Sequence, residues 1–223
     1  MASYFVKIRV LVILTILSFT ILGLVVFQIG NEALFLLINR TITPGFGQLA
    51  RLFSAFGETA PILILILFYL FKSFRFSLTL AFSWLLGSCF SWAFKYGFAK
   101  NALRPEKFFL NLNQPIETVS GVEVHHYHSF PSGHTLTAFT LVLVLPFFFR
   151  RVHFGTAIVF WVMAFGCGLS RIVLAQHWPV DVLGGIFFGC LTAIISVWAS
   201  FLISGFKWSN WKLKFWGIER EGF

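Results

Sequence analysis

Several long stretches of this chain consist almost entirely of apolar residues, and the first, residues 10–29, contains no charged residue. A stretch of about 20 apolar residues is long enough to cross a bilayer as a helix. Similar stretches recur along the sequence, in which 58% of the 223 residues are hydrophobic and only 11% are charged. A soluble domain does not need so much apolar surface. The sequence therefore predicts an all-α, polytopic membrane protein.

Six segments are predicted to span the membrane as a helical bundle. The first lacks the short apolar core and the small-residue cleavage site of a signal peptide, so it is interpreted as a transmembrane helix. The second has an apolar core of only about 14 residues and must borrow from residues 53–60 to span. The chain has no polar linker, so residues 1–223 are predicted to form one domain. The predicted spans are residues 10–29, 53–74, 76–98, 132–149, 154–173 and 179–205.

Three segments between or after these spans have other compositions. Residues 31–59 are mixed and are predicted to contain an amphipathic helix at the membrane interface. Residues 100–130 are polar and predicted to form a loop, and loops of that length are usually functional or disordered. The tail mixes tryptophan and lysine, which is typical of a membrane interface.

The cations are scattered between the apolar segments, so the net charge of +9 indicates membrane topology and not a nucleic-acid-binding face. Six spans place both termini on one side. That side carries ten Lys or Arg and two acids, whereas the other carries seven cations and six acids. Because positive charge marks the cytoplasmic side, the termini are predicted to lie inside and the long loop outside. The ten are Lys7, Arg9, Lys72, Arg75, Arg150, Arg151, Lys207, Lys212, Lys214 and Arg220.

Three polar clusters are predicted at this outer membrane face, where ionisable residues next to apolar spans are expensive unless they have a function. They lie at the end of the third span, at the start of the fourth, and in the hinge between the fifth and sixth. Together they supply cations, two histidines and one carboxylate. Their members are Lys95 or Lys100 with Arg104, then Ser132, Gly133 and His134, and finally Arg171, His177 and Asp181.

These residue types suit phosphate chemistry. Arginine matches phosphate oxygens with two parallel hydrogen bonds, and the free amides at a helix start attract anions. Gly133 lets the backbone come close. Two histidines and one acid, without the several carboxylates of a two-metal site, indicate a nucleophile and a general acid acting without a metal or other cofactor. Asp181 follows His177 by four positions, near enough to hold its second ring nitrogen.

The pattern resembles the type 2 phosphatidic acid phosphatase (PAP2) family, which is related to vanadium haloperoxidases. That family has a lysine before Arg-Pro, then Pro-Ser-Gly-His, then Ser-Arg, five residues, His, three residues and Asp. The last two motifs are matched here without a gap, at residues 131–134 and 170–181. The first motif departs from the pattern: eight residues separate Lys95 from Arg104 and three separate Lys100 from it, where the family has six. Lys95 is preferred because it ends a predicted helix.

The resemblance implies a role for each residue. His177 would be the nucleophile that forms a phosphohistidine, Asp181 its orienting partner, and His134 the acid that protonates the leaving group. The remaining matched residues would hold the phosphate, namely Lys95, Arg104, Ser132, Gly133 and Arg171.

Structural alternatives exist for the individual residues. Ser132 could cap a helix, Asp181 could complement a helix dipole, and Arg171 could extend to the lipid headgroups. His125, His126 and His128, with Glu123, invite a zinc-site interpretation, although their spacing fits no known pattern. We prefer a polar loop at the mouth of the pocket.

The resemblance implies a lipid phosphate phosphatase in the bacterial inner membrane, with its site on the periplasmic face. Its substrate would be undecaprenyl pyrophosphate, a lipid A phosphate, phosphatidylglycerophosphate or phosphatidate, and the oligomeric state stays open. Two rivals remain: a vanadate-dependent haloperoxidase, and a catalytically silent protein that binds or transports lipid phosphates.

Overall fold

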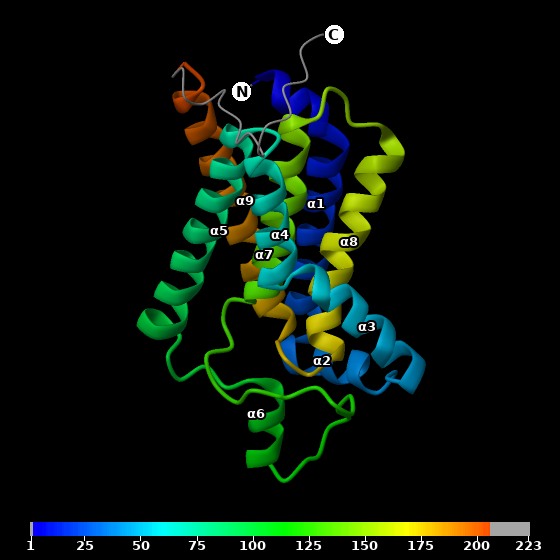
Figure 1. Cartoon of the computed structure of the whole chain (residues 1–223). Helices are drawn as coiled ribbons and strands as arrows, with labels where there is room; N and C mark the ends of the chain where they lie inside the picture. Colours follow the sequence, from blue (N-terminus) through cyan, green and yellow to red (C-terminus); the bar gives the residue numbers. More distant parts are fainter. Residues whose placement is uncertain (1, 206–223) are drawn as a thin grey trace.

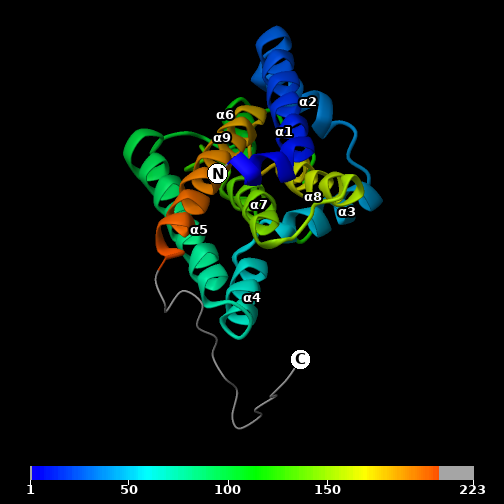
Figure 2. The ribbon, with the colours of Figure 1, turned by 90° about the horizontal axis from the view of Figure 1, so that it is seen from above.

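Helix α7, Gly133–Val144, stands at the centre of the bundle, with α5, α8 and α9 packed around it (Figure 2). Nearly every residue from Thr135 to Val144 is buried, because this helix is apolar on all sides. At Pro146 it tightens into the 3₁₀ turn η2, Leu145–Phe148. The motif that carries His134 is therefore held at the start of the most enclosed helix.

The computed structural model describes residues 2–205, which form helices and irregular connections without a strand (Figure 1). The helices around α7 are α1 (Ala2–Ile29), α5 (Phe74–Ala93), α8 (Phe154–Val173) and α9 (Pro179–Ile203). Five stretches of the described residues are long and apolar enough to span a membrane, and Gly133–Phe148 is a shorter apolar helix. The predicted all-helical membrane bundle is confirmed, with six spans only if this shorter helix is counted.

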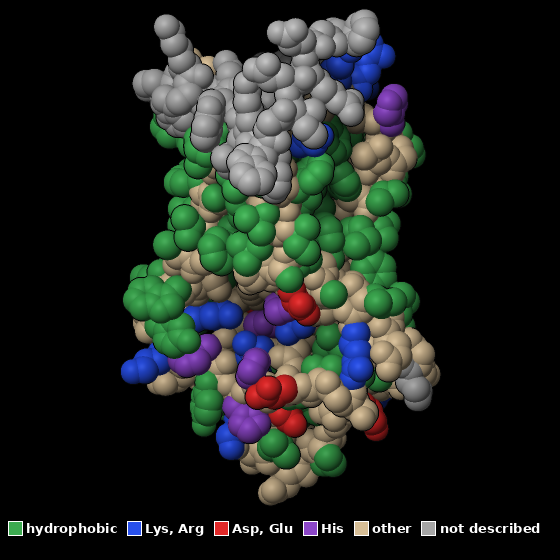
Figure 3. All heavy atoms as spheres, viewed as in Figure 1, with side chains coloured by type: hydrophobic (Ala, Val, Ile, Leu, Met, Phe, Trp, Pro, Cys, Tyr) green, Lys and Arg blue, Asp and Glu red, His purple; other side chains and the backbone are tan. Residues whose placement is uncertain are grey.

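The outside of the bundle is apolar at mid-height, where a belt of hydrophobic side chains covers the face seen in Figure 3. On α1, for example, Ile16, Ile21 and Phe27 are 58%, 59% and 87% exposed. Exposed apolar area of this extent marks a lipid-facing surface. The protein is therefore an integral membrane protein.

The second predicted span is wrong in one respect, because the structure interrupts it. α3, Pro44–Phe56, ends at Gly57, and α4 runs over Thr59–Leu70. A Cβ atom on Gly57 would lie 2.5 Å from the His134 carbonyl oxygen and 2.6 Å from Cys167 Sγ. The chain therefore passes against α7 and α8 at a point where only glycine fits.

Two further segments are more ordered than the sequence predicts. Residues 31–59 hold not one amphipathic helix but α2, Asn31–Asn39, followed by α3. The predicted loop of residues 100–130 contains the short helix α6, Pro105–Asn111, where proline occupies the first helical turn.

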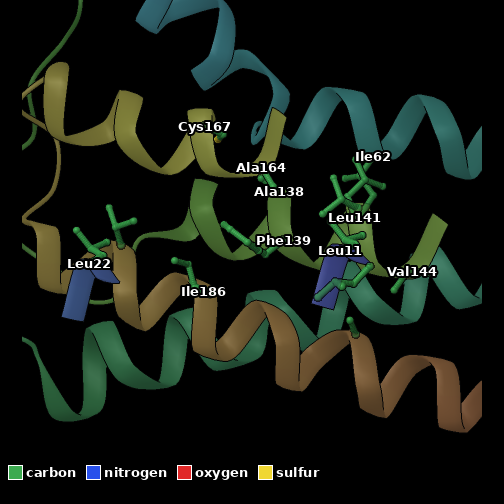
Figure 4. Close-up of a cluster of buried hydrophobic side chains, with 14 of the residues drawn as sticks. Leu11, Leu22, Ile62, Ala138, Phe139, Leu141, Val144, Ala164, Cys167 and Ile186 are labelled. Atoms are coloured by element: carbon green, nitrogen blue, oxygen red, sulfur yellow. The ribbon is translucent and has the colours of Figure 1, made fainter. Parts of the chain in front are cut away.

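The core lies where α7 meets α1, α4, α8 and α9, and Figure 4 shows Phe139 of α7 among side chains from these helices. α9 approaches α7 closely through small residues. A Cβ atom on Gly185 would lie 2.8 Å from the Ser132 carbonyl oxygen, and one on Gly189 2.9 Å from that of Leu136. This close approach brings the start of α9 against the start of α7, where the Ser132 N–H donates to the Asp181 carbonyl at 3.0 Å.

The two ends of the bundle differ. α1 begins and α9 ends at one end, together with the α4–α5 and η2–α8 turns, while α6 and the α8–α9 hinge lie at the other (Figure 1). The α4–α5 turn carries Lys72 and Arg75, and the η2–α8 turn carries Arg150 and Arg151. Four other cations of the predicted inner side, Lys207, Lys212, Lys214 and Arg220, and the predicted interfacial tail lie outside the described residues.

Candidate active site

The predicted site residues come from four segments: the end of α5, the start of α6, the start of α7 and the hinge between α8 and α9. α5 continues into a π-helical turn, η1, at Phe94–Phe98. His177 lies close enough to four other predicted residues for their charges to interact, namely Arg104, Arg171, Lys95 and His134. The structure therefore brings all three sequence clusters together.

The hinge between α8 and α9 holds His177 outside both helices. The Arg171 carbonyl accepts hydrogen bonds from the N–H of Gln176 at 2.9 Å and of His177 at 3.1 Å. Ala175 takes the left-handed conformation, with φ of 54°, that often ends a helix. Pro179 then begins α9. His177 is thereby fixed at the junction with only 2% of its surface exposed.

The Asp181 carboxylate caps α9 and also faces His177. Its Oδ2 accepts hydrogen bonds from the Trp178 N–H at 2.9 Å and from the Ser129 hydroxyl at 2.5 Å. The same oxygen lies 3.3 Å from His177 Nδ1. Asp181 can therefore act both as a residue that stabilises the start of α9 and as the partner that orients the His177 imidazole.

The contacts of His177 assign its proton to Nδ1. That nitrogen faces the Asp181 carboxylate, whereas Nε2 lies 3.5 Å from Arg104 Nη1, which can only donate. Burial, followed by the charges of Arg104, Arg171 and Lys95, holds the pKa of His177 well below its ordinary value. The imidazole is therefore neutral, with its lone pair on Nε2, which is the nucleophilic form.

Two buried arginines present guanidinium groups beside His177. Arg104 is 6% exposed, and its Nε donates to the Tyr127 carbonyl at 3.0 Å and its Nη1 to the Gln176 carbonyl at 2.9 Å. Arg171 is 7% exposed and donates from Nη1 to Ser54 Oγ at 2.5 Å, but its buried Nε has no partner among the described residues. A buried donor without an acceptor is costly, and an oxyanion would satisfy it.

The start of α7 lies close enough to these arginines for their charges to interact with His134. Ser132 Oγ accepts from the Thr135 N–H at 3.4 Å, so this side chain caps the helix. The N–H groups of the first helical residues, beginning with Gly133, have no partner within the helix. A Cβ atom on Gly133 would lie 3.6 Å from Ser91 Oγ and 3.8 Å from Lys95 Nζ. Lys95 therefore projects over the glycine, where an anion can meet both.

Of the two candidate lysines, the structure places Lys95 in the site. Lys95 belongs to η1 and lines a cavity with His134, while Lys100 is exposed and is not among the residues lining it. The Lys95 carbonyl lies 3.1 Å from His128 Nδ1. π-Helical turns occur frequently at functional sites, and this one holds the lysine whose spacing departs from the family pattern.

The histidine-rich loop forms pairwise contacts. His126 Nε2 lies 3.3 Å from Glu106 Oε2, and the His128 ring packs on Tyr96 with centroids 4.5 Å apart. Within residues 2–205, no group of three or more His, Cys, Asp or Glu side chains is placed to hold a metal ion. His128 therefore contacts Lys95 and Tyr96 at the edge of the site.

Sequence reasoning missed three contact residues of the site: Ser129, Ser54 and Gln176. Ser129 stands three residues before Ser132, so its place beside the motif signals proximity, but nothing in the pattern shows that it faces Asp181. Ser54 reaches Arg171 across 117 residues of sequence, and no motif includes it. Gln176 lies inside the motif at a position that the family pattern leaves unspecified.

Replacing Ser129 with alanine should lower kcat about tenfold while KM stays nearly unchanged. The change removes a charge-assisted donor to Asp181, and such bonds contribute about 1.5–3 kcal/mol. Ser129 is not among the residues that line the cavity next to Gly133 and Lys95, so substrate binding should be unaffected. Ser129→Thr keeps the hydroxyl and should recover most of the activity. An equal loss in both variants, or a change in KM alone, would contradict this role.

The low pKa of His177 predicts how stability depends on pH. A histidine whose pKa is lower in the folded than in the unfolded state stabilises the fold fully above the unfolded value, about pH 6.5. That contribution is lost as the pH falls below this value. Thermal unfolding in detergent should therefore show a falling midpoint between about pH 7 and 5, and a smaller fall in His177→Gln. Parallel curves for the two proteins would refute the lowered pKa.

Comparison with known proteins places this site in a family. A model of the PAP2 superfamily matches residues 76–204, which include all the predicted site residues. BcrC, a bacitracin transport permease protein of Bacillus licheniformis, is 33% identical over 91 residues, or 39% of this chain and 43% of that protein. The putative undecaprenyl-diphosphatase YbjG of Escherichia coli is 35% identical over 88 residues, or 37% and 42%. A lipid A 1-phosphatase of Porphyromonas gingivalis is 36% identical over 76 residues, or 34% and 17%.

The chain thus spans less than half the length of these curated relatives. The likeness extends further in three dimensions. The crystal structure of Aquifex aeolicus LpxE superimposes with a TM-score of 0.63 and 27% identity, covering 75% of this chain and 94% of that one. With more than half of its residues matched by the family model, this chain belongs to the PAP2 superfamily.

Proposed function

We propose that this protein is a metal-independent phosphatase that removes a phosphate group from a membrane lipid. The observation that carries the proposal is the buried pair of His177 and Asp181, facing Arg104, Arg171 and the free amides of α7. The relatives named lipid A 1-phosphatase and undecaprenyl-diphosphatase support a lipid phosphate as the substrate. A site at the end of an apolar bundle suits a substrate whose acyl or prenyl chains stay in the bilayer.

In the first step, Nε2 of His177 attacks phosphorus and the bond from phosphorus to the lipid oxygen breaks. His134 gives its proton to the departing oxygen, so the lipid leaves as an alcohol or, from a pyrophosphate, as a protonated phosphate. Nδ1 keeps its proton and its hydrogen bond to Asp181, which stabilises the positive ring. Arg104 turns from Nε2 to a phosphoryl oxygen as the bond forms.

In the second step, water attacks the phosphohistidine. His134, now neutral, accepts a proton from this water, the bond between phosphorus and Nε2 breaks, and His177 returns to its starting form. Charge on the three phosphoryl oxygens is met in both steps by Arg171, Arg104 and Lys95, which is the main requirement of phosphoryl transfer.

The proposed mechanism uses no metal ion, because the side chains of the site do not resemble the ligand set of a two-metal phosphatase. Within residues 2–205, Asp181 is the only carboxylate in contact with His177, and its Oδ2 faces the Trp178 N–H, the Ser129 hydroxyl and the His177 ring. A two-metal phosphatase uses several carboxylates to bridge and hold its ions. Three cationic side chains supply the positive charge here.

The site is proposed to face the periplasm from a bacterial inner membrane. It lies at the end of the bundle opposite the start of α1 and the end of α9 (Figure 1). Among the described residues, the end with the start of α1 carries Arg9, Lys72, Arg75, Arg150 and Arg151 and no acidic side chain, and such a positive balance marks a cytoplasmic side. Lipids would then be dephosphorylated in the outer leaflet.

The proposed activity is tested by incubating the purified protein, in excess chelator, with total membrane lipid and identifying by mass spectrometry the species that lose one phosphate group. We expect a lipid phosphomonoester or pyrophosphate to lose it in the presence of wild-type protein only. A His177→Ala sample is the control. Identical lipid profiles for both proteins would favour the silent binding protein, and activity that requires added metal would contradict the mechanism.

A further inference from the structure

A cavity of about 590 Å³ lies on the His134 side of the proposed site. α5 and η1 form one wall, and the starts of α4 and α7 form the other. His134 and Lys95 line the cavity, but His177, Arg104 and Arg171 do not. Figure 3 shows acidic, basic and histidine side chains gathered at the lower edge of the apolar belt. The cavity therefore meets the site from the side of the proposed general acid.

The geometry of in-line phosphoryl transfer indicates which part of the substrate occupies this cavity. The attacking and the leaving atoms lie on opposite sides of phosphorus. His177 attacks from a buried position, at 2% exposure, and the group that protonates the leaving oxygen lines the cavity. The leaving part of the substrate therefore occupies the cavity, while the transferred phosphate lies between it and His177.

The charges of this cavity are uneven. Among the described residues, Lys95 is the only Lys or Arg that lines it, and this lysine projects over Gly133, beside the transferred phosphate. The only carboxylate that the described part of the chain contributes to the lining is Glu58, an exposed side chain at the break between α3 and α4. No residue within 2–205 forms a hydrogen bond or ion pair with the Glu58 side chain. The charge of Glu58 reaches Arg171, but Arg171 does not line the cavity. A second phosphate in the cavity would thus meet the Glu58 carboxylate, while Lys95 lies beside the transferred phosphate.

The rest of the lining suits an uncharged polar group. Thr59, Ser88 and Thr137 offer hydroxyl groups from three different helices. Trp92 and Tyr96 are 66% and 51% exposed, with ring centroids 5.8 Å apart. Exposed rings of this kind give an apolar face against which a sugar or polyol can pack, while the hydroxyl groups and the carboxylate accept its hydrogen bonds.

We propose that Glu58 determines the specificity of this leaving-group subsite. Its carboxylate accepts a hydrogen bond from a hydroxyl group of an uncharged sugar or polyol, and it repels the second phosphate of a pyrophosphate lipid. The preferred substrate is then a phosphomonoester of a hydroxylated headgroup. This inference rests on the proposed phosphatase function.

The test compares kcat/KM of the wild type, Glu58→Gln and Glu32→Gln on two probes, a lipid-linked glucosamine 1-phosphate and undecaprenyl pyrophosphate. The wild type should prefer the sugar phosphate. Glu58→Gln, which keeps the shape and loses the charge, should act about tenfold more slowly on the sugar phosphate, because a charge-assisted hydrogen bond becomes a neutral one. It should also act several-fold faster on the pyrophosphate as the repulsion is removed.

Glu32→Gln is the matched control, since Glu32 is also an exposed acid at the start of a helix and does not line the cavity. It should behave as the wild type on both probes. The specificity proposal alone is overturned if Glu58→Gln changes both probes by the same factor, or if the wild type prefers the pyrophosphate. If the wild type releases phosphate from neither probe nor from any lipid of the total extract, the proposed function fails as well.

Discussion

Replacing His177 with alanine should reduce phosphate release by about 10⁴-fold or more, the scale of loss when a covalent nucleophile is removed. The neighbouring cations and amides would still bind phosphate, but the variant lacks the buried imidazole that is proposed to form the covalent intermediate. The measurement is steady-state phosphate release in detergent with excess chelator.

Two controls separate this effect from damage to the fold. His153→Ala removes an exposed histidine at the start of α8, at the other end of the bundle, and should keep full activity. The His177→Ala protein should still bind inorganic phosphate, because Arg104, Arg171 and Lys95 remain. A variant that binds phosphate and turns over substrate within tenfold of the wild type would exclude His177 as the nucleophile.

Replacing His134 with alanine should produce a loss that depends on the leaving group. With an alkyl phosphate the departing alkoxide needs a proton, so kcat should fall by about 10²–10⁴-fold, the range for general acid catalysis. With p-nitrophenyl phosphate the departing phenolate is stable without a proton, so the first step should be nearly normal. The second step still needs His134 to accept a proton from water.

A burst of p-nitrophenol followed by slow turnover is therefore expected from His134→Ala in rapid-mixing experiments. His153→Ala, the exposed control at the other end of the bundle, should show no burst. Equal losses on the alkyl and the aryl phosphate would contradict the assignment of His134 as the acid, and would indicate that it only binds phosphate.

Much of the fold could be predicted from apolar runs, but the break at Gly57 could not. The spans at α1, α8 and α9 begin or end within a few residues of their predicted bounds, because length and apolarity decide them. The Gly57 break depends on how closely the chain passes the His134 carbonyl and Cys167, which is a packing property. That break also places Glu58 in the cavity, so the proposed specificity could not be predicted from the sequence.

In the site, too, some contacts could be predicted from the sequence and others depend on how the helices pack. The motif spacing alone brings His177 and Asp181 within reach, since they lie four positions apart. The donors that hold these groups come from other segments: Ser129 from the long loop, and Ser54 from a helix 117 residues before Arg171. Such contacts follow from how the helices pack, and no local pattern encodes them.

The lysine of the first motif is also identified by the structure and not by the spacing of the sequence. A pattern of fixed spacing cannot choose between Lys95 and Lys100, because each departs from it. The structure chooses Lys95, since η1 carries this side chain to Gly133 while Lys100 stays exposed.

The central claim is that Nε2 of His177 becomes phosphorylated during turnover, and trapping that intermediate tests it most directly. His134→Ala, mixed with p-nitrophenyl phosphate and quenched in alkali, should carry one phosphate group per active site. Peptide mass spectrometry should locate the group on His177, at the ring nitrogen that does not face Asp181, as an acid-labile and alkali-stable adduct. Phosphate release without any labelling of His177, or labelling of another residue that persists in His177→Ala, would contradict the mechanism.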